Sequence, residues 1–457
     1  MSTVFSHSRS HLISYRSVML NVALSLFFFL TGCKDSTPGT PPATGINKVN
    51  HVVVIYLENH SFDNLYGEFA GADGLTNAAN TQTQVDSAGD AMTVLPFVAG
   101  SPYPNNLPNK PFNIDQFRPW DSTTSDLVHR YYQEQMQIDG GKMDKYALIS
   151  DAKGLSVGYY HTAELPLAVE AKKYVLCDRF FHSAFGGSFL NHQIFIAAAP
   201  PTFTNAPASA IAKLDANGKV IQDGYVSPDG YAINTSFTVN TPHPSSVPTA
   251  NLVPNQTNPT IGDRLSAANV SWAWYSGGWN NALNGTPDKL FQFHHQPFAY
   301  YQKYADGTQA RKDHLKDETD FRAAAAAGTL PAVSFVKPLG DDNEHPGYTD
   351  LAKGEKYTLD LINAVRNGPN WNDCVIIITY DEHGGFWDHV APPTIDKWGP
   401  GTRVPGIIIS TFAKTGFIDH TQYETLSILA FIEKRWGLSP LTTRDANADP
   451  FSNAFSF

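Results

Sequence analysis

Carboxylate and amide side chains follow directly after two apolar runs of the sequence. Glu58 and Asn59 end the first run, and Asp381 and Glu382 end a second run, residues 374–380, that is rich in β-branched residues. Such runs predict strands buried on both faces. Ligands of open α/β sheets bind at the carboxyl ends of strands, so we expect both pairs to face one site. Taken alone, Glu58 and Asn59 would equally suit a helix-start cap.

A serine stands between a glycine pair and an apolar helical run. Gly186 and Gly187 predict a tight turn, and Ser188 begins the run that follows. The start of a helix offers free backbone N–H groups and the positive end of the dipole, which stabilise an alkoxide or an incoming phosphate. The alternative is that Ser188 serves only as the helix N-cap.

Several histidines lie in loops or near element ends, namely His129, His294, His295 and His345. We expect His129 in the first turn of a helix that starts near residue 126. Adjacent side chains diverge, so only one of the neighbours His294 and His295 is expected to face a site directly. Each of these histidines alone is more often structural, and they become informative only as a group.

Together these groups indicate phosphate-ester hydrolysis. Oxygen ligands suit a divalent cation, which would lower the pKa of a serine hydroxyl and screen a phosphoryl group. Histidines can bind phosphoryl oxygens or protonate the leaving alcohol. The sequence has neither the Gly-x-Ser-x-Gly elbow of α/β-hydrolases nor a phosphate-cradling Gly-Lys-Ser/Thr loop.

Other apolar segments must position these residues. Strands are predicted at residues 51–57, 174–177, 270–275, 332–336, 374–380 and 404–410, and helices at 162–173 (capped by Thr162), 188–199, 353–367 and 426–436. Strands that alternate with helices, without hairpin signals, predict an α/β three-layer sandwich with a mainly parallel central sheet. Polar stretches at 70–125 and 200–260 predict long loop insertions, the second as a wall over the pocket.

The composition favours one large exported domain. The chain has 457 residues, of which 42% are hydrophobic and 16% charged, together with 31 Pro and 34 Gly. This excludes a disordered chain. Cys177 and Cys374 lie in strand-like contexts, where they either form a disulfide or remain free buried thiols.

The first 32 residues predict a targeting segment. Arg9 and Arg16 precede the apolar residues 22–30, and Leu-Thr-Gly then leads to Cys33, as in a bacterial lipoprotein signal. The apolar run is short for a membrane span. The alternative is an ordinary signal peptide with a chance cysteine.

The predicted organisation is a signal peptide over residues 1–32, a lipidated Cys33 with a Pro/Thr/Gly tether to residue 48, and a catalytic domain over 49–457. We expect an exported lipoprotein, anchored in the outer membrane and facing the periplasm or the cell surface. Loss of residues 1–32 removes two basic residues and no acidic one, so the net charge becomes −13 instead of −11. Such an acidic chain is a poor binder of nucleic acid.

Residues 52–67, 178–192, 291–297 and 380–393 resemble the phosphoesterase family that unites bacterial phospholipases C with a branch of acid phosphatases. That family belongs to the alkaline-phosphatase-like superfamily. The segments ENHSFD and DEHGGFWDHV, in this order, carry the resemblance. It extends from about residue 50 to the end of the chain, interrupted by the polar insertions, and implies an alkaline-phosphatase-like fold.

The resemblance also implies roles for individual residues. The implied ligands of one divalent metal ion are Glu58, Asn59, Ser188, Asp381 and Glu382, with Ser188 as the nucleophile. The implied phosphate-pocket residues are His129, His294, His295 and His345. Asn191, His192, Asp388 and His389 are expected to contact substrate or to support the site from behind. Gly187 and His192 depart from the family pattern, which has Pro and Arg there.

The acid-phosphatase branch fits better than the phospholipase branch. The latter is typified by a threonine nucleophile, a twin-Arg signal and further C-terminal domains, whereas this chain has Ser188 and a lipoprotein-like signal. We therefore expect a phosphomonoesterase. The alternatives are a phospholipase C-type phosphodiesterase and a catalytically inactive, lipid-anchored binding protein.

Overall fold

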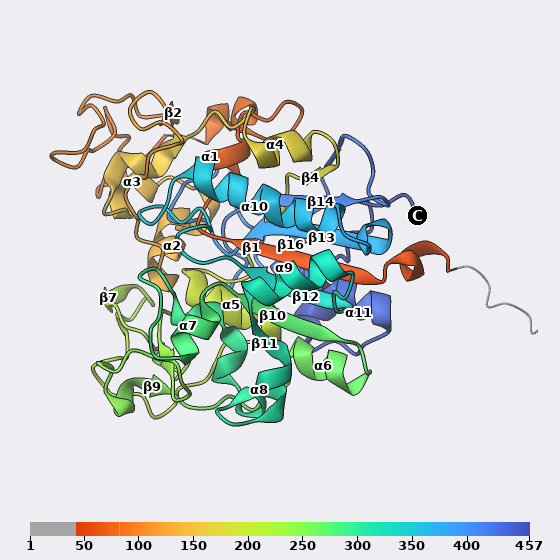
Figure 1. Ribbon diagram of the computed structural model, residues 1–457. Helices are drawn as coiled ribbons and strands as arrows, with labels where there is room; N and C mark the ends of the chain where they lie inside the picture. Colours follow the sequence, from red (N-terminus) through yellow and green to blue (C-terminus); the bar gives the residue numbers. More distant parts are fainter. Residues whose placement is uncertain (1–42, 82) are drawn as a thin grey trace, which may run out of the picture. The chain divides into compact units, whose positions relative to one another are not determined.

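A twisted eight-stranded sheet forms the centre of the structure, a computed structural model that describes residues 43–81 and 83–457 (Figure 1). Within this part of the chain, residues Thr44–Phe457 form one compact unit. The predicted signal peptide and Cys33 lie outside the described residues. Among those described, no helix is long and apolar enough to cross a membrane.

The strand order brings distant parts of the chain side by side. From one edge to the other the strands are β11 (Leu315–Asp317), β10 (Trp272–Ser276), β12 (Val333–Lys337), β1 (His51–Leu57), β13 (Cys374–Tyr380), β14 (Gly406–Ser410), β4 (Val175–Cys177) and β15 (Phe417–Asp419). β14 runs antiparallel to both of its neighbours, and the other pairings are parallel. The mainly parallel sheet is therefore confirmed.

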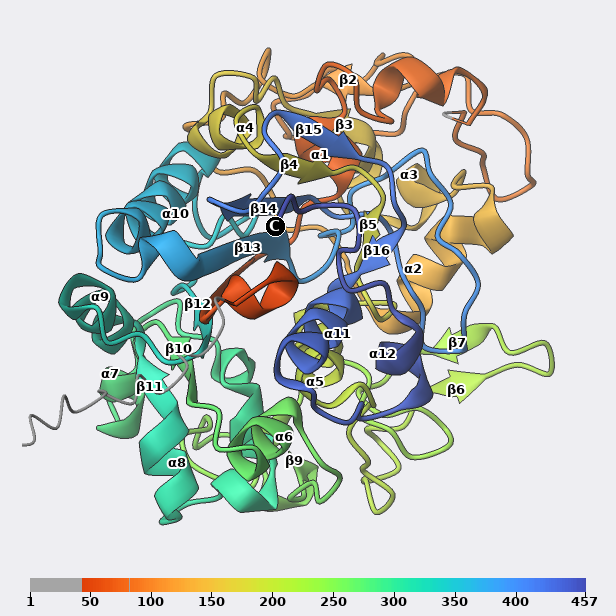
Figure 2. The same cartoon turned by 90° about the vertical axis from the view of Figure 1, so that its right-hand side faces the viewer.

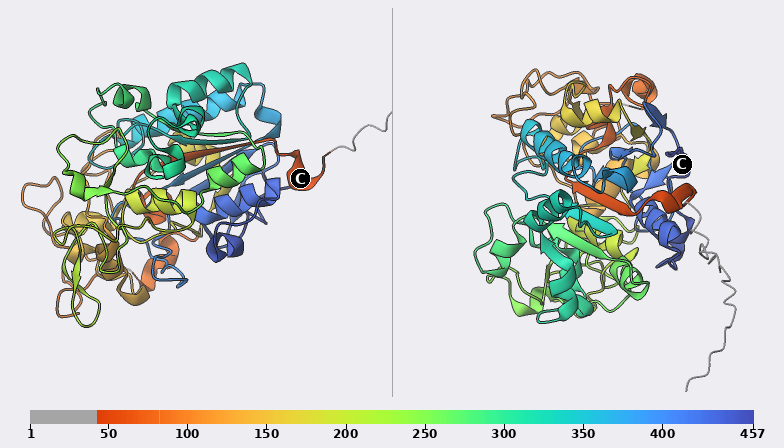
Figure 3. Two further views of the ribbon diagram at one scale, coloured as in Figure 1. Left: turned by 90° about the horizontal axis from the view of Figure 1, so that it is seen from below. Right: turned by 45° about the vertical axis from the view of Figure 1, so that its right-hand side comes forward.

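Helices cover both faces of the sheet, which completes three layers (Figures 2 and 3). One face carries α4 (Pro166–Ala171), α9 (Glu318–Ala327) and α10 (Leu351–Arg366), and the other carries α5 (Ser188–Ala197), α6 (Ile261–Ala267) and α11 (Thr425–Trp436). With cover on both sides, β13 is buried along its whole length and β1 over all but its first residue. This explains their continuous apolar sequences.

The remaining elements are short, and many lie in the loops at the carboxyl end of β1 (Figure 1). The helices are α1 (Phe62–Tyr66), α2 (Tyr131–Ile138), α3 (Tyr146–Ile149), α7 (Trp279–Leu283), α8 (Gln309–His314) and α12 (Thr443–Asn447). Small strand pairs join β2 (Phe112–Asn113) to β3 (Gly158–Tyr159), β5 (Phe180–Phe181) to β16 (Tyr423–Glu424), β6 (Lys213–Leu214) to β7 (Val220–Gln222), and β8 (Phe237–Thr238) to β9 (Leu252–Val253). The two predicted insertions thus contain ordered turns and short pairings.

Two predicted helix starts are wrong. α2 begins at Tyr131, so His129 precedes the helix and does not lie in its first turn. α4 begins at Pro166 with Leu165 as its cap, while the hydroxyl of Thr162 donates to the carbonyl of Leu65. His129 and Thr162, which local sequence rules assign to the helix ends, instead make contacts outside the helices.

Cys177 and Cys374 are free and buried. They lie in β4 and β13, which flank β14 in the sheet. Strands two positions apart are separated by about 10 Å, which is too far for a disulfide. Of the two alternatives, the structure therefore shows free thiols.

Candidate active site

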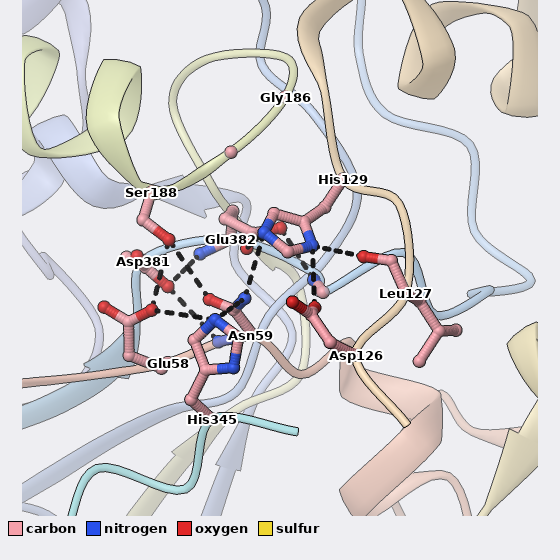
Figure 4. Close-up of polar contacts among 12 residues, drawn as sticks. Glu58, Asn59, Asp126, Leu127, His129, Gly186, Ser188, His345, Asp381 and Glu382 are labelled. Atoms are coloured by element: carbon pink, nitrogen blue, oxygen red, sulfur yellow. Dashed lines mark hydrogen bonds and ion pairs between the residues drawn. The ribbon is translucent and has the colours of Figure 1, made fainter. Parts of the chain in front are cut away.

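The carboxyl ends of two adjacent strands bring the predicted acidic residues together. β1 and β13 pair in parallel with Leu57 opposite Tyr380. The amide of Asp381 then donates to the carbonyl of Leu57 at 3.0 Å, which extends the ladder by one residue. The side chains grouped in this way are those of Glu58, Asn59, Asp381 and Glu382 (Figure 4).

Ser188 is the first residue of α5, and its side chain points at this group (Figure 4). Its Oγ donates toward Glu58 Oε2 at 3.1 Å and lies 3.3 Å from Asn59 Oδ1. Gly187 occupies the cap position. The structure therefore does not show Ser188 as the N-cap.

The turn before Ser188 requires glycine. Gly186 has a φ of +91°, and a Cβ there would come within 2.5 Å of the Tyr131 nitrogen. A Cβ on Gly187 would lie 2.7 Å from the carbonyl oxygen of His129. The turn thus packs directly on the backbone that leads into α2, which brings His129 to the site opposite Ser188 (Figure 4).

Three buried carboxylates lie close together at the site. Glu58 is 1% exposed, and Asp381 and Glu382 are fully buried. Burial and the nearby charge of Glu58 raise the pKa of Asp381 well above its usual value, and burial with the charge of Asp381 does the same for the pKa of Glu382. Among the described residues, Asp381 Oδ2 and Glu382 Oε1 have no hydrogen-bond partner.

Lys337, the last residue of β12, is a site residue that the sequence analysis missed. It is fully buried, and its Nζ pairs with Glu58 Oε1 and donates to the Leu57 carbonyl at 3.2 Å. Although burial opposes ionisation of Glu58, the charges of Lys337 and His295 hold the pKa of that carboxyl well below its usual range. The sequence does contain a signal for Lys337, because a lysine at the end of a buried apolar strand needs an oppositely charged partner nearby.

His295 and His345 contact Glu58 from two directions. The Nε2 of His295 is 2.8 Å from Glu58 Oε1, and the Nε2 of His345 is 3.9 Å from Glu58 Oε2. The same His345 nitrogen lies 3.0 Å from Asn59 Nδ2. Burial lowers the pKa of His295 to about 4, against the opposing effect of Glu58, and burial also lowers the pKa of His345.

His294 and His192 pack around His295. The His192 ring stacks on His295 with centroids 5.1 Å apart, and the His294 ring meets His295 edge-on at 4.7 Å. His192 Nδ1 lies 2.7 Å from the carbonyl oxygen of Ser188. Of the adjacent pair, His295 is thus the member paired with Glu58, while His294 Nδ1 has no hydrogen-bond partner in the described part of the chain.

His129 lies on the more open side of the site. Its side chain is 19% exposed, against 3% for His295. Its Nδ1 lies 2.5 Å from the carbonyl oxygen of Leu127, so Nε2 faces the site. That Nε2 is 3.4 Å from Asn59 Nδ2 and 3.9 Å from Glu382 Oε1.

Asp388 and His389 lie in a buried ion cluster beside the acidic loop. Arg403, fully buried, donates through Nε to Asp388 at 2.8 Å and pairs with Asp63 at 3.2 Å. His389 Nδ1 is 2.6 Å from Asp63 Oδ2. Since Asp63 lies on α1, four residues after Asn59, the cluster connects the loops after β1 and β13. The sequence analysis also missed Arg403, which nothing in its neighbourhood distinguishes from a surface arginine.

Asn191 holds the turn that precedes Ser188. Its Oδ1 accepts from the Ala184 amide, and its Nδ2 donates to the Ala184 carbonyl, both at 2.9 Å. The same Nδ2 lies 3.3 Å from the carbonyl oxygens of Gly186 and Gly187. This side chain supports the serine segment from behind.

The oxygen atoms at the strand ends fit a divalent cation. Buried carboxylates with unpartnered oxygens, an amide oxygen and a hydroxyl form the donor set that hard cations prefer. A bound cation would also balance the negative charge that raises the pKa values of Asp381 and Glu382. The residues present therefore fit the expected metal ion.

A second set of possible ligands lies next to the first. Glu58, His192 and His295 offer ligand atoms within 4.8 Å of one another. However, the ammonium of Lys337 pairs with the Glu58 oxygen that faces His295. A cation there would meet the charge of Lys337 at short range. The oxygen set is thus the better metal site.

Curated relatives of this chain are phospholipases. Non-hemolytic phospholipase C of Pseudomonas aeruginosa is 24% identical over 471 residues, which cover 90% of this chain and 58% of that protein. Phospholipase C B of Mycobacterium tuberculosis is 23% identical and covers 92% and 80%. Non-specific phospholipase C6 of Arabidopsis thaliana is 34% identical over 169 residues, which cover 30% and 32%. The chain thus spans little more than half of the Pseudomonas relative.

Solved structures with a related arrangement include a protein in the alkaline phosphatase superfamily from Vibrio parahaemolyticus, with a TM-score of 0.35 and 10% identity over 73% of each chain. Another is the phosphonate monoester hydrolase from Silicibacter pomeroyi, with a TM-score of 0.29 and 10% identity over 60% of this chain and 68% of that one. TM-scores of this size carry no conclusion about the activity of this chain.

The sequence profile of the Phosphoesterase family matches residues 49–439, a span that includes every site residue described above. The match covers most of the 457-residue chain. The chain therefore belongs to the Phosphoesterase family.

Proposed function

We propose that this protein hydrolyses phosphate monoesters, with Ser188 as the nucleophile. The observation that carries the proposal is the position of Ser188 Oγ, 3.1 Å from Glu58 Oε2 and 3.3 Å from Asn59 Oδ1. The hydroxyl lies at the start of α5, where the helix dipole favours its deprotonated form. The metal ligands we propose are Glu58, Asn59, Ser188, Asp381 and Glu382.

The reaction would proceed in two transfers. The proposed ligands would hold a divalent cation, whose positive charge would lower the pKa of the Ser188 hydroxyl and screen the phosphoryl charge. Ser188 would lose its proton to solvent before the attack. Ser188 Oγ then attacks phosphorus while the bond to the leaving oxygen breaks and His129 protonates that oxygen. Water next gives a proton to His129 and attacks the phosphoserine, and phosphate leaves as Ser188 Oγ is released.

His129 is our choice for the proton donor because of its exposure. The leaving alcohol must depart toward solvent, and His129 is more exposed than His345, with side-chain exposures of 19% and 5%. The contact of its Nδ1 with the Leu127 carbonyl leaves Nε2 for proton transfer. His294, His295 and His345 would contact the phosphoryl oxygens.

A phospholipase C-type phosphodiesterase is the second candidate. It is favoured by the relatives reported above, which are phospholipases C. Assays of phosphatidylcholine beside p-nitrophenyl phosphate separate the two activities, and we expect faster turnover of the monoester. The third possibility, an inactive binding protein anchored by its lipid, would require that neither ester is hydrolysed.

The test of the mechanism is Ser188→Ala. We expect a loss of at least about 10³-fold in kcat for p-nitrophenyl phosphate with an unchanged Tm, because the nucleophile is removed from a well-packed helix start. Ser156→Ala is the matched control, since Ser156 is a buried serine whose hydroxyl donates to the local carbonyl of Lys153. Near-normal turnover by Ser188→Ala, or full activity of chelator-treated protein, would overturn the mechanism.

We also propose that the protein reaches the membrane through a lipid on Cys33. The support is the sequence around Cys33 and the Pro/Thr/Gly stretch after it. Phosphate esters would then be met at the membrane surface or in the periplasm.

A further inference from the structure

Glu134 is a fully buried carboxylate on α2, outside the ligand set described above. Its Oε1 accepts from His182 Nε2 and from both the amide and the hydroxyl of Thr402, each at 2.9 Å. Its Oε2 accepts from the amide of Gly186 at 2.5 Å. A carboxylate with this many donors is held in one position.

The partners of Glu134 belong to segments that carry the site. Gly186 lies two residues before Ser188. His383 directly follows Glu382, and its Nε2 is 3.6 Å from Glu134 Oε1. The rings of His182 and His383 stack with centroids 5.5 Å apart. One buried side chain therefore connects the serine turn with the acidic loop after β13.

The backbone of the same region packs on the serine turn. Gly186 lies against the backbone of Tyr131, and Gly187 lies against the carbonyl of His129, so neither position has room for a Cβ. Glu134 accepts a hydrogen bond from the Gly186 amide on one side of the turn. The backbone of His129 and Tyr131, which precede Glu134 in the chain, packs against the turn. The position of Ser188 depends on both contacts.

The Glu134 group could also be considered as a metal site, since Glu134, His182 and His383 offer ligand atoms within 4.8 Å of one another. The hydrogen bonds argue against this. Glu134 Oε1 already accepts from Thr402 and His182, and His182 Nδ1 lies 3.3 Å from the amide oxygen of Asn191. Burial raises the pKa of Glu134, but the facing His182 and His383 rings outweigh it and bring the value to about 2, as expected for a carboxylate that serves as an acceptor.

We propose that Glu134 is a positioning residue for catalysis, which fixes the Gly186-Gly187 turn through the Gly186 amide and thereby orients Ser188 toward Glu58 and Asn59. The inference rests on the proposed function, because it assigns Ser188 as the nucleophile. Its structural part, the fixing of the turn, can be measured without turnover.

The test compares Glu134→Gln with Glu170→Gln. Glutamine keeps the size of the side chain but has only one acceptor oxygen. Its NH₂ group must therefore face either the N–H of Gly186 or the donor groups of Thr402 and His182. Glu170 is a matched control, because it is buried on α4 and paired with Lys173 and Arg366. For Glu134→Gln we expect kcat for p-nitrophenyl phosphate to fall about 10- to 100-fold with KM changed less than about threefold, since small displacements of a nucleophile cost rate more than binding.

Hydrogen exchange supplies the readout that does not depend on activity. In Glu134→Gln, the amides of residues 186–190 should exchange faster while those of β1 and β13 remain protected, and the bound-metal content should be unchanged. In Glu170→Gln all of these quantities should match the wild type. If Glu134→Gln does not fold, Glu134→Asp, which keeps the charge but shortens the reach, undergoes the same comparison.

A kcat loss no larger than in Glu170→Gln, or unchanged exchange at residues 186–190, would overturn the positioning role. Failure of the proposed function looks different. Wild-type protein would then hydrolyse no phosphate ester, while exchange in Glu134→Gln would still report whether the carboxylate fixes the turn.

Discussion

The two oxygens of Glu58 face different partners. Oε1 pairs with Lys337 and His295, whereas Oε2 faces Ser188. Lys337 therefore fixes the orientation of this carboxylate and balances its charge inside the protein. A cation bound beside Oε2 would complete the balance for the neighbouring carboxylates.

Replacing Lys337 by methionine should destabilise the metal-free protein by about 3 kcal/mol, because it leaves Glu58 buried without its lysine partner. The loss should be smaller with saturating divalent cation, since the cation supplies positive charge and binds the folded state selectively. Urea unfolding of wild type and Lys337→Met, with chelator and with cation, measures both effects. Lys356→Met, on an exposed lysine, serves as the control. Equal stability of wild type and Lys337→Met under chelation would contradict this account.

At the level of residues, the sequence predicted the groups that follow strong strand patterns. Glu58 and Asp381 directly follow mostly apolar strands, and Ser188 follows a glycine pair, so each has a local signal. Glu134 and Arg403 have none, because Glu134 pairs with Thr402 and Arg403 with Asp63, which are distant in sequence. Which remote charges pair depends on the fold, so these pairs cannot be predicted from a single sequence.

At the level of elements, apolar patterns predicted the central strands but not their directions. The pattern of β14 resembles that of β13, yet β14 runs antiparallel to it. Alternation and burial are the same for both directions, so the pattern carries no such information. The ends of helices were the least predictable feature, as α2 shows: its start is fixed by the contacts of His129 and Gly186-Gly187.

The hydrogen bonds of Glu134 should make the free energy of unfolding decrease at low pH. Its folded pKa is about 2, below the ordinary value of 4.5, so its contribution is complete above about pH 4.5 and is lost as pH falls toward 2. The contribution is about 3 kcal/mol at pH 7 and decreases by about 2 kcal/mol between pH 7 and pH 3. Because Glu134→Gln cannot titrate there, the difference in free energy of unfolding between wild type and variant should shrink by that amount.

Urea unfolding of both proteins at pH 7, 5 and 3 measures this difference, with Ser156→Ala as a control that should show no such trend. A difference that stays constant from pH 7 to pH 3 would show that Glu134 is not held in its ionised form by its neighbours.

At the level of the whole molecule, the long loops after the parallel strands gather at one end of the sheet, where the candidate site lies (Figure 1). The compact unit begins at Thr44, eleven residues after the lipidation site we propose at Cys33. The net charge of −13 that remains without residues 1–32 disfavours attraction of the folded part to an anionic membrane surface. Membrane association would therefore depend on the lipid.

Cys33→Ser should move the protein from the membrane fraction to the soluble periplasmic fraction while leaving phosphatase activity per molecule unchanged, because Cys33 precedes the compact unit that holds the site. Fractionation of cells that express each form, followed by immunoblotting, measures the distribution. Equal membrane retention of both forms would refute the lipid anchor and favour an ordinary signal peptide.

The free thiols of Cys177 and Cys374 lie in two strands on either side of β14, and burial raises the pKa of both. A thiol-reactive dye must reach a thiolate, so neither cysteine can be labelled until its strand separates from its neighbours. The rate of dye incorporation therefore measures how fast the sheet opens. Since the two strands flank β14, a difference between the two labelling rates would show from which side the sheet comes apart.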